Sequence, residues 1–253
     1  MIHRQAVSAA VTLLRLDHGA VSAMDIELLE AFRAELAKCA ADEVAVVITG
    51  TGRAFSAGVD LRRILDGGPG YVRRFIPALS ATFEDTLRYQ RPVVAAVNGH
   101  AIAGGCVLAC CADIRFMAAG TGRVGVPELL VGVPFPAMAL AALRLATGDR
   151  GLEEIVYTGA TYLPEEAQPR GLVDEVLPPG DLVGRAIECA ERLATIPPAA
   201  YRHTKRTLRG PVLDWAEGPA ARQADEEMTE LWTSPAAAAA VSAYVENTLG
   251  RRG

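Results

Sequence analysis

Apolar and polar positions along the chain follow two periods, one typical of buried strands and one typical of helices. Alternating and β-branched apolar residues over 7–16 predict an early strand. Short continuous apolar runs at 44–49 and 92–97 predict two buried strands, each ending at a glycine-containing turn. Over 24–39 the apolar side chains recur at helical spacing. Repeated strand-then-helix units of this kind predict an α/β core.

Glycine-rich segments interrupt the pattern at two places. Residues 67–70 read Gly-Gly-Pro-Gly and predict a flexible loop before an amphipathic helical stretch over 72–89. Residues 98–107 follow the second buried strand and lead into an apolar helix predicted over 106–112. Backbone N–H groups at the start of a helix lack intrahelical acceptors, so this turn can hold a developing negative charge.

The C-terminal part of the chain has a different pattern. It is helical over 182–194 and again over 198–249, and Pro197-Pro198 lies between the two stretches. We therefore expect a core of residues 1–196 followed by a helical region of residues 197–253. Large apolar side chains in that region need a partner, either the core or another subunit. They are Trp215, Leu231, Trp232 and Tyr244.

Composition narrows the class of protein. The 253 residues suffice for one sizeable core, or for a core with a helical appendage, and 51% hydrophobic residues are typical of a soluble globular protein. A formal net charge of −5 argues against nucleic acid as a partner, because phosphate contacts need clustered Lys and Arg. The basic run from Arg202 to Arg206 is either a solvated helix face or a contact for one anionic ligand.

The cysteines, the histidines and the apolar runs argue against further classes of protein. The five cysteines have no paired extracellular spacing, and we expect buried, reduced thiols. No Cys/His set has the spacing of a metal site, so no metal is expected. There is no apolar signal segment after the N-terminus, and no apolar run approaches the ~20 residues that span a bilayer. We expect a cytoplasmic protein with no membrane partner.

Four separated segments carry glycines, prolines and acidic residues in a characteristic order. They are FSAGVDL at 55–61, RPVVAAVNGHAIAGGC at 91–106 with CADIR at 111–115, VGVPEL at 124–129 with GVP at 132–134, and YTG, EEA and GLVDEV within 157–176. In order and spacing they resemble the enoyl-CoA hydratase/isomerase (crotonase) family. The resemblance covers nearly the whole chain.

The resemblance implies both a fold and a class of substrate. The implied fold is an α/β, left-handed spiral of strand–strand–helix (ββα) turns, with a C-terminal helical trimerisation region. A homotrimer, or a dimer of trimers, is therefore expected. Members bind acyl-CoA thioesters, so coenzyme A is part of the substrate and no separate cofactor is expected.

The resemblance also implies an oxyanion hole made of main-chain groups. Its two donors fall on the backbone N–H groups of Val59 and Gly104, and an enolate oxygen between them would be stabilised in a dry pocket. Neighbouring glycines let backbone approach the ligand where a side chain would obstruct it. Asp60 either orders the first donor loop or caps a helix that begins at Leu61.

The same resemblance places the acid/base at Glu128, and it shows that a second carboxylate expected in hydratases is missing from this chain. Residues around Glu128 are apolar, and desolvation is expected to raise its pKa. The other glutamate with which hydratases hold water falls at Val107, which can neither accept nor donate a proton. Phe135 and Met138 are expected to make the pocket drier. One base is enough to move a proton from C2 to C4, so the pattern resembles the Δ3,Δ2-enoyl-CoA isomerases of the family.

Contacts to coenzyme A are implied at several further positions. The pantetheine arm is expected near Ala20 and Ser22 and along Ala57, Asp60 and Leu61. Ser22 stands where relatives usually have asparagine. The candidates for the adenine are Tyr244, Arg251 and Arg252, and those for the phosphates are Arg62, Arg63, Arg73 and Arg74.

Three functions follow from these residues. The first is an enoyl-CoA isomerase with Glu128 as the shuttle, and the second is a hydratase working with a single glutamate. The third belongs to another class, a non-catalytic acyl-CoA-binding protein. His100 and Cys106 lie in the glycine-rich segment, but we expect Cys106 to be packed, and His100 to be packed or hydrogen-bonded, rather than catalytic.

Overall fold

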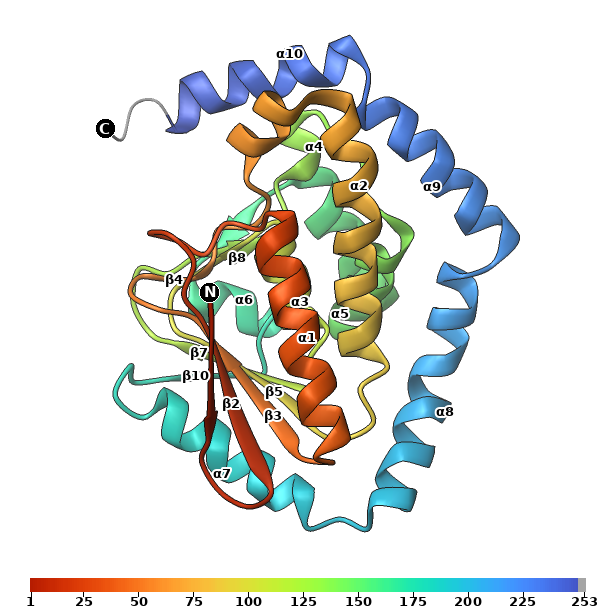
Figure 1. Cartoon of the computed structure of the whole chain (residues 1–253). Helices are drawn as coiled ribbons and strands as arrows, with labels where there is room; N and C mark the ends of the chain where they lie inside the picture. The colour runs from red at the N-terminus through yellow and green to blue at the C-terminus, as the bar shows by residue number, and fades with distance from the viewer. Residues whose placement is uncertain (250–253) are drawn as a thin grey trace.

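The strands form two sheets in the computed structural model, which describes residues 1–249 (Figure 1). In the larger sheet β1 and β2 pair antiparallel and all other neighbours pair parallel. Its order is β1 (Ile2–Ala6), β2 (Val11–Leu16), β3 (Ala45–Thr49), β5 (Val93–Val97), β7 (Ile114–Ala118) and β10 (Glu175–Leu177). The smaller sheet has the order β4 (Ala54–Ser56), β6 (His100–Ile102), β8 (Val124–Gly125) and β9 (Thr161–Tyr162).

The chain passes three times from the larger sheet to the smaller sheet and then into a helix. The three turns are β3–β4–α2 (Leu61–Leu87), β5–β6–α3 (Gly104–Cys110) and β7–β8–α4 (Glu128–Val131). This is the ββα repeat that the sequence predicts. Because β4, β6 and β8 are parallel neighbours, the segments that follow them come out at the same edge of the smaller sheet. Val59, Gly104 and Glu128 all lie in those segments.

Both faces of the larger sheet are buried. Alternate strand residues point to opposite sides, so that Val46 and Ile48 belong to the main core with α1 (Ile26–Ala41) and α2, whereas Ala45 and Val47 pack against α7 (Leu182–Ala194). Burial on both faces explains why the strands are continuous apolar runs in the sequence.

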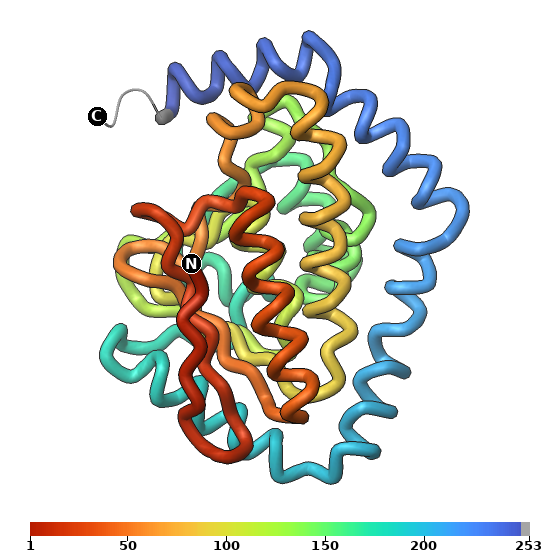
Figure 2. The backbone as a smooth tube through the Cα atoms, in the orientation of Figure 1, coloured from red at the N-terminus to blue at the C-terminus, as the bar shows by residue number. Residues whose placement is uncertain are grey.

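The last three helices run around the outside of the core (blue in Figures 1 and 2). They are α8 (Pro198–Ala216), α9 (Pro219–Trp232) and α10 (Pro235–Tyr244), followed by a π-helical turn at Val245–Leu249. They contact α5 (Ala137–Thr158), α2 and α4, and Trp232 is buried in the main core. The core of the same chain is thus a partner of this region, although Trp215 and Leu231 remain 42% and 57% exposed. The remaining short helices are α6 (Pro164–Ala167) and a 3-10 turn at Gln168–Arg170.

Three sequence predictions need correction. Residues 7–16 are not one strand, because the chain turns back after β1 and forms the hairpin of β1 and β2. Residues 67–70 are not an open loop: Gly68 (φ 61°, ψ −163°) is non-helical and divides α2 at a kink into two helical segments, with Pro69 directly after it. Helix α3 begins at Gly104, two residues earlier than predicted. The prediction for the cysteines is confirmed, since all five are free and buried.

Candidate active site

The first expected oxyanion donor, Val59, lies in a loop held by backbone hydrogen bonds to Met24. The N–H of Met24 donates to the carbonyl of Gly58 (2.7 Å), and the N–H of Asp60 donates to the carbonyl of Met24 (2.9 Å). These bonds pair Met24 with Val59 in a parallel bridge, so the N–H of Val59 points away from Met24. In residues 1–249 this N–H has no backbone acceptor.

The second expected donor, Gly104, is the first residue of α3. It follows Ala103, which has the positive φ of 52° that only a tightly constrained turn imposes on a residue with a Cβ. The N–H groups of the first helical turn have no acceptor within the helix. The N–H of Gly104 also donates to no other backbone carbonyl within the described chain.

The two donor loops are in direct contact through glycine. A Cβ built on Gly58 (φ +79°) would overlap the carbonyl oxygen of Ile102 and would lie 2.7 Å from the Cβ of Ala103 and 3.0 Å from the nitrogen of Gly104. A Cβ built on Gly104 would lie 3.9 Å from the Cα of Gly58. The backbone at Gly58 and the backbone at Gly104 therefore approach to within van der Waals contact. A side chain at position 58 would force these two segments apart.

Polar side chains brace the same loops. Ser56 Oγ donates to the carbonyl of Ser22 (2.7 Å) and accepts from the N–H of Gly58 (3.1 Å). Asn98 joins the turns after β3 and β5, because its Oδ1 accepts from the N–H of Gly50 (2.8 Å) and its Nδ2 donates to the carbonyl of Gly52 (3.0 Å). Asp60 caps α2 by accepting from the N–H groups of Arg62 and Arg63 (3.1 Å each). The capping alternative for Asp60 is thus confirmed.

Glu128 is the first residue of α4 and carries a buried carboxylate. Gly125 precedes it by three residues and pairs with Ile102, and the N–H of Ala103 donates to the carbonyl of Gly125 (2.8 Å). Glu128 therefore lies close to the start of α3. Its Oε2 is shielded from solvent and accepts no hydrogen bond from any group in residues 1–249. Burial raises the pKa of Glu128 from 4.5 to about 8, as the apolar sequence around it predicts.

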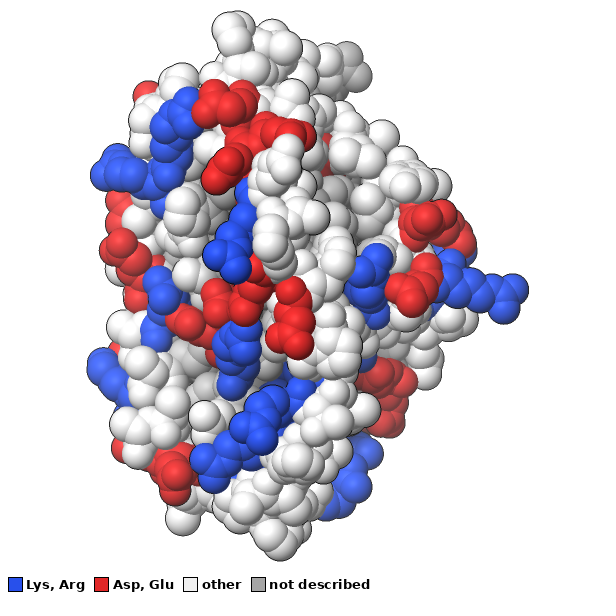
Figure 3. Space-filling model, turned by 90° about the vertical axis from the view of Figure 1, so that its right-hand side faces the viewer, with Lys and Arg blue, Asp and Glu red and all other residues white. Residues whose placement is uncertain are grey.

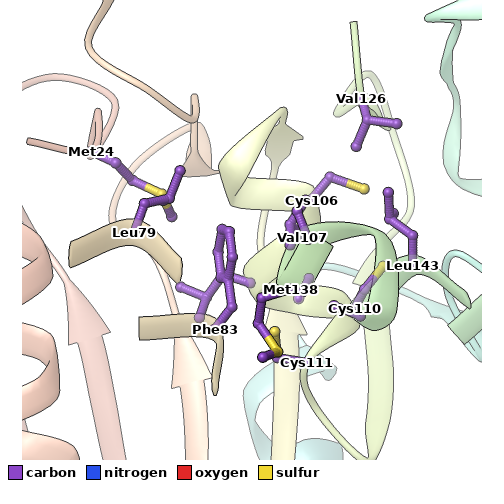
Figure 4. Close-up of a cluster of buried hydrophobic side chains, with 14 of the residues drawn as sticks. Met24, Leu79, Phe83, Cys106, Val107, Cys110, Cys111, Val126, Met138 and Leu143 are labelled. Atoms are coloured by element: carbon purple, nitrogen blue, oxygen red, sulfur yellow. The ribbon is translucent and has the colours of Figure 1, made fainter. Parts of the chain in front are cut away.

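Val107 lies one turn into α3 and is 1% exposed. Figure 4 shows it among Phe83, Cys106 and Met138, in a cluster of apolar and sulfur-containing side chains. Met138 and Phe135 are 6% and 9% exposed. A carboxylate at position 107 would meet an apolar environment here.

Cys106 of the glycine-rich segment is buried and His100 is hydrogen-bonded, as predicted. A hydrogen bond with Cys110, burial and the nearby carboxylate of Glu128 raise the pKa of the Cys106 thiol well above its usual range. A protonated thiol is a poor nucleophile. His100 Nδ1 accepts from the backbone N–H of Arg123 (3.2 Å).

The positions expected to contact coenzyme A fall into two groups. Ser22 and Ala57 lie beside the donor loop, where the N–H of Ala57 donates to the carbonyl of Val21 (2.9 Å), and Leu61 packs on the core next to Asp60. Ala20 is exposed in the turn before them. Tyr244 lies at the end of α10 and packs on the main core of its own chain. Arg251 and Arg252 are outside the described residues.

Three of the four arginines expected to contact the phosphates, Arg63, Arg73 and Arg74, are engaged with other side chains. Arg63 pairs with Glu27 (2.5 Å), and Arg73 on α2 pairs with Glu230 on α9 (2.8 Å). Arg74 lies over the ring of Tyr71, 6.0 Å from its centroid. A phosphate would have to compete with these partners.

The sequence does not reveal the place of Met24. Its backbone pairs with Val59, and its Sδ would lie only 2.9 Å from a Cβ on Gly104, so its side chain stands beside the second donor. In the sequence Met24 is one of several apolar residues near a helix start, and no pattern separates a residue of that kind from the rest of the core.

The C-terminal helices support the turn that follows α4. Trp232 Nε1 donates to the carbonyl of Pro134 (2.9 Å), and Asp225 accepts from the N–H of Ala137 (2.8 Å). At the end of α4, a Cβ on Gly132 would lie 2.8 Å from the Cβ of Ala240 on α10. The turn after α4 is therefore held in place partly by α9 and α10.

Metal and membrane features can be stated for the described part of the chain. Within residues 1–249, no three His, Cys, Asp or Glu side chains gather where they could hold a metal ion. No helix in this range combines the length and apolar character needed to cross a membrane.

Comparison with known proteins gives matches along most of the chain. Residues 6–249 match the model of the enoyl-CoA hydratase/isomerase family. A putative enoyl-CoA hydratase of Thermus thermophilus is 36% identical over 167 residues, which are 65% of this chain and 65% of that protein. A probable enoyl-CoA hydratase of Rhizobium meliloti is 33% identical over 205 residues, 79% of this chain and 77% of the relative. The human mitochondrial Δ3-Δ2-enoyl-CoA isomerase superposes with a TM-score of 0.93 over 100% of this chain and 99% of its own; at 23% identity this shows a shared fold.

Proposed function

Because the chain belongs to the enoyl-CoA hydratase/isomerase family, we propose that it is an enzyme that shifts a double bond in an enoyl-CoA thioester, with Glu128 as the acid/base. The observation that supports this proposal is the shielded Glu128 carboxylate oxygen, which has no hydrogen-bond partner within the described residues, in a chain with buried valine where hydratases are expected to have a second glutamate. A carboxylate whose pKa lies near 8 is well matched to taking and returning a proton at neutral pH.

The proposed reaction needs only one proton carrier. Glu128 takes a proton from C2 of a 3-enoyl thioester, and the electron pair moves into the thioester carbonyl to give an enolate. The N–H groups of Val59 and Gly104 donate to the enolate oxygen, each worth about 3 kcal/mol of barrier by comparison with other oxyanion holes. Glu128 then returns the proton at C4, and the double bond moves from C3–C4 to C2–C3. Atoms and charge balance without a further reactant.

Coenzyme A enters this proposal as part of the substrate. Its pantetheine arm would run along Ala20, Ser22, Ala57 and Leu61, beside the loop that carries the first donor. We further propose that copies of the chain assemble as trimers in the cytoplasm, with Tyr244 near the adenine. The exposed side chains of Leu130 and Tyr157 (62% and 68%) are apolar surface for such an assembly.

Hydration is the second candidate function. The names of the Thermus and Rhizobium relatives favour it, since both are called enoyl-CoA hydratases. In this chain a hydratase would have to hold and activate water with Glu128 alone, because Val107 is apolar and is buried in the main core with Phe135 and Met138. An acyl-CoA-binding protein without activity is the third candidate, and a buried base near two free N–H groups makes it the weakest of the three.

Product analysis with two panels of substrates separates these functions. We expect 3-enoyl-CoA thioesters to be converted to 2-enoyl-CoA of the same mass, with the rise in ultraviolet absorbance of a conjugated thioester. A gain of one water from 2-enoyl-CoA as the faster reaction would establish the hydratase instead. Binding without turnover, and without exchange at C2 in heavy water, would establish the non-catalytic protein, since exchange needs both the base and the oxyanion hole.

Val107→Glu tests whether the lost carboxylate limits hydration. We expect hydration of 2-enoyl-CoA to remain no faster than in the wild type, because the new carboxylate enters an apolar cluster and its pKa rises, which leaves it protonated and unable to activate water. Val107→Gln has a similar shape without the charge and serves as the control for packing. An increase of tenfold or more in hydration by Val107→Glu over Val107→Gln would contradict this and favour the hydratase.

A further inference from the structure

A cavity of about 410 Å³ lies between the end of α1, the end of α2 and the start of α8. The 16 residues of α1 extend over about 24 Å, and the loop paired with Val59 lies at the opposite end of that helix. The cavity is therefore remote from the proposed acyl-CoA site. Its charged lining consists of Arg33, Arg88, Arg91 and Arg202 with Glu43 and Asp85.

Two of these arginines are neutralised and two are not. Arg33 pairs with Asp85 (2.6 Å), and Arg88 pairs with Glu84 (3.0 Å) and with Glu217. Across residues 1–249, neither Arg91 nor Arg202 has a carboxylate within 4.0 Å. Arg202 Nη1 instead donates to Oε1 of Gln90 (2.9 Å), which holds its guanidinium over the cavity without cancelling its charge.

Arg91 leaves much of its hydrogen-bonding capacity unused. Its Nη2 donates to the carbonyl of Ala194 over a long 3.3 Å, whereas Nε and Nη1 are shielded from solvent and have no partner within residues 1–249. Unpaired donors on a buried charged group are costly. Because they are shielded, Nε and Nη1 do not face the cavity as it stands, and the Arg91 side chain would have to turn to offer them to an acceptor there.

Further positive charge lies directly behind Arg91. Lys205 Nζ donates to the carbonyl of Arg91 (3.2 Å) and to Asp113 (2.8 Å), and Arg209 also pairs with Asp113 (2.8 Å). The single carboxylate of Asp113 is thus shared by two cationic side chains, those of Lys205 and Arg209. Burial lowers the pKa of Lys205 to about 8, so its ammonium is still charged at pH 7. In Figure 3, Lys and Arg side chains gather across the lower part of the face along which the C-terminal helices run.

We propose that this cavity binds a small phosphate-bearing anion, held by the guanidinium groups of Arg91 and Arg202. The planar fork of arginine matches phosphate geometry, and the four arginines of the lining outnumber its two carboxylates, those of Glu43 and Asp85. The cavity lies within the usual size range for a small-molecule site, about 300–1,000 Å³. The anion would connect α1 and α2 to α8 and so fasten the C-terminal helices to the core.

Calorimetric titration of the full chain at constant ionic strength tests the site. Inorganic phosphate and pyrophosphate are expected to bind saturably. Arg202→Gln should weaken that binding by about tenfold or more, because it removes a charge-assisted hydrogen bond. Arg206→Gln is the matched control, since Arg206 is exposed on the same helix, does not line the cavity and should change binding less than twofold. Excess coenzyme A is expected not to displace the bound anion.

Four results would overturn the proposal. They are no saturable binding up to about 10 mM anion, equal weakening by Arg206→Gln and Arg202→Gln, displacement by coenzyme A, and equally tight binding of malonate, which would make the site one for dicarboxylates. A thermal scan gives an independent reading. Pyrophosphate at several times its Kd should raise the Tm of the wild type by about 2–4 °C, and should raise that of Arg202→Gln by less.

Discussion

Glu128→Gln is expected to lower kcat for double-bond migration by about 10²–10⁴-fold while changing the Kd of a saturated acyl-CoA less than twofold. The amide keeps the shape of the carboxylate but cannot accept a proton, and the main-chain donors at Val59 and Gly104 are untouched. Turnover is measured from the absorbance of the conjugated thioester, and binding by calorimetry with the non-reactive ester. Glu165→Gln is a matched control, because Glu165 is an exposed glutamate in the first turn of another short helix.

The pH dependence of activity and of stability gives a second test of Glu128. Burial raises the pKa of Glu128 to about 8, and the base must be ionised to act, so kcat/KM should rise with pH up to about 8 and level off above it. The folded protein holds this proton more tightly than the unfolded chain does. Between pH 4.5 and about 8 the free energy of unfolding should therefore fall as pH rises, and Glu128→Gln should flatten that slope. Wild-type activity in Glu128→Gln would rule out Glu128 as the shuttle.

Gly58→Ala is expected to lower kcat/KM by about 10²–10³-fold, which is the cost of losing one oxyanion donor. The new Cβ would overlap the carbonyl of Ile102 and meet the Cβ of Ala103 at 2.7 Å, so the loops that carry Val59 and Gly104 must move apart. The positive φ of 79° adds strain of about 1–2 kcal/mol.

Gly52→Ala separates the effect of the steric contact at position 58 from the effect of backbone strain at a positive φ. Gly52 also has a positive φ (64°), but a Cβ there has nothing within 4 Å. Both variants should lose stability from backbone strain, and Gly58→Ala should lower the Tm further because of its steric overlap, whereas only Gly58→Ala should lose activity. An equal loss of activity in the two variants would show that the close approach of the donor loops is not needed for the reaction.

Local sequence signals predict the elements of the core well. Continuous apolar runs locate β3 and β5 because both faces of the larger sheet are buried. Asp60 caps α2, which is one of the two roles predicted for it. The sequence can predict a cap because a side-chain oxygen before a helix accepts hydrogen bonds from N–H groups only two and three residues away. The raised pKa of Glu128 follows from the apolar residues next to it in the chain.

What the sequence does not predict depends on contacts between distant segments. The hairpin of β1 and β2 is missed because apolar residues continue through its turn. The kink at Gly68 is missed because glycine next to proline usually ends a helix, whereas here the packing of α2 on the core resumes beyond it. The pairing of Met24 with Val59 joins residues far apart in sequence, and no local pattern encodes it.

The contacts of Trp232 with Pro134, and of Ala240 with Gly132, have a consequence for how the protein is made. Synthesis on the ribosome proceeds from the N-terminus, and domains fold as their residues emerge. Glu128 and both donor loops leave the ribosome long before residues 232–240 exist. Until then the turn after α4 lacks the contacts that α9 and α10 make with it. This part of the fold, next to Glu128 in the chain, is therefore completed only when the last helix docks.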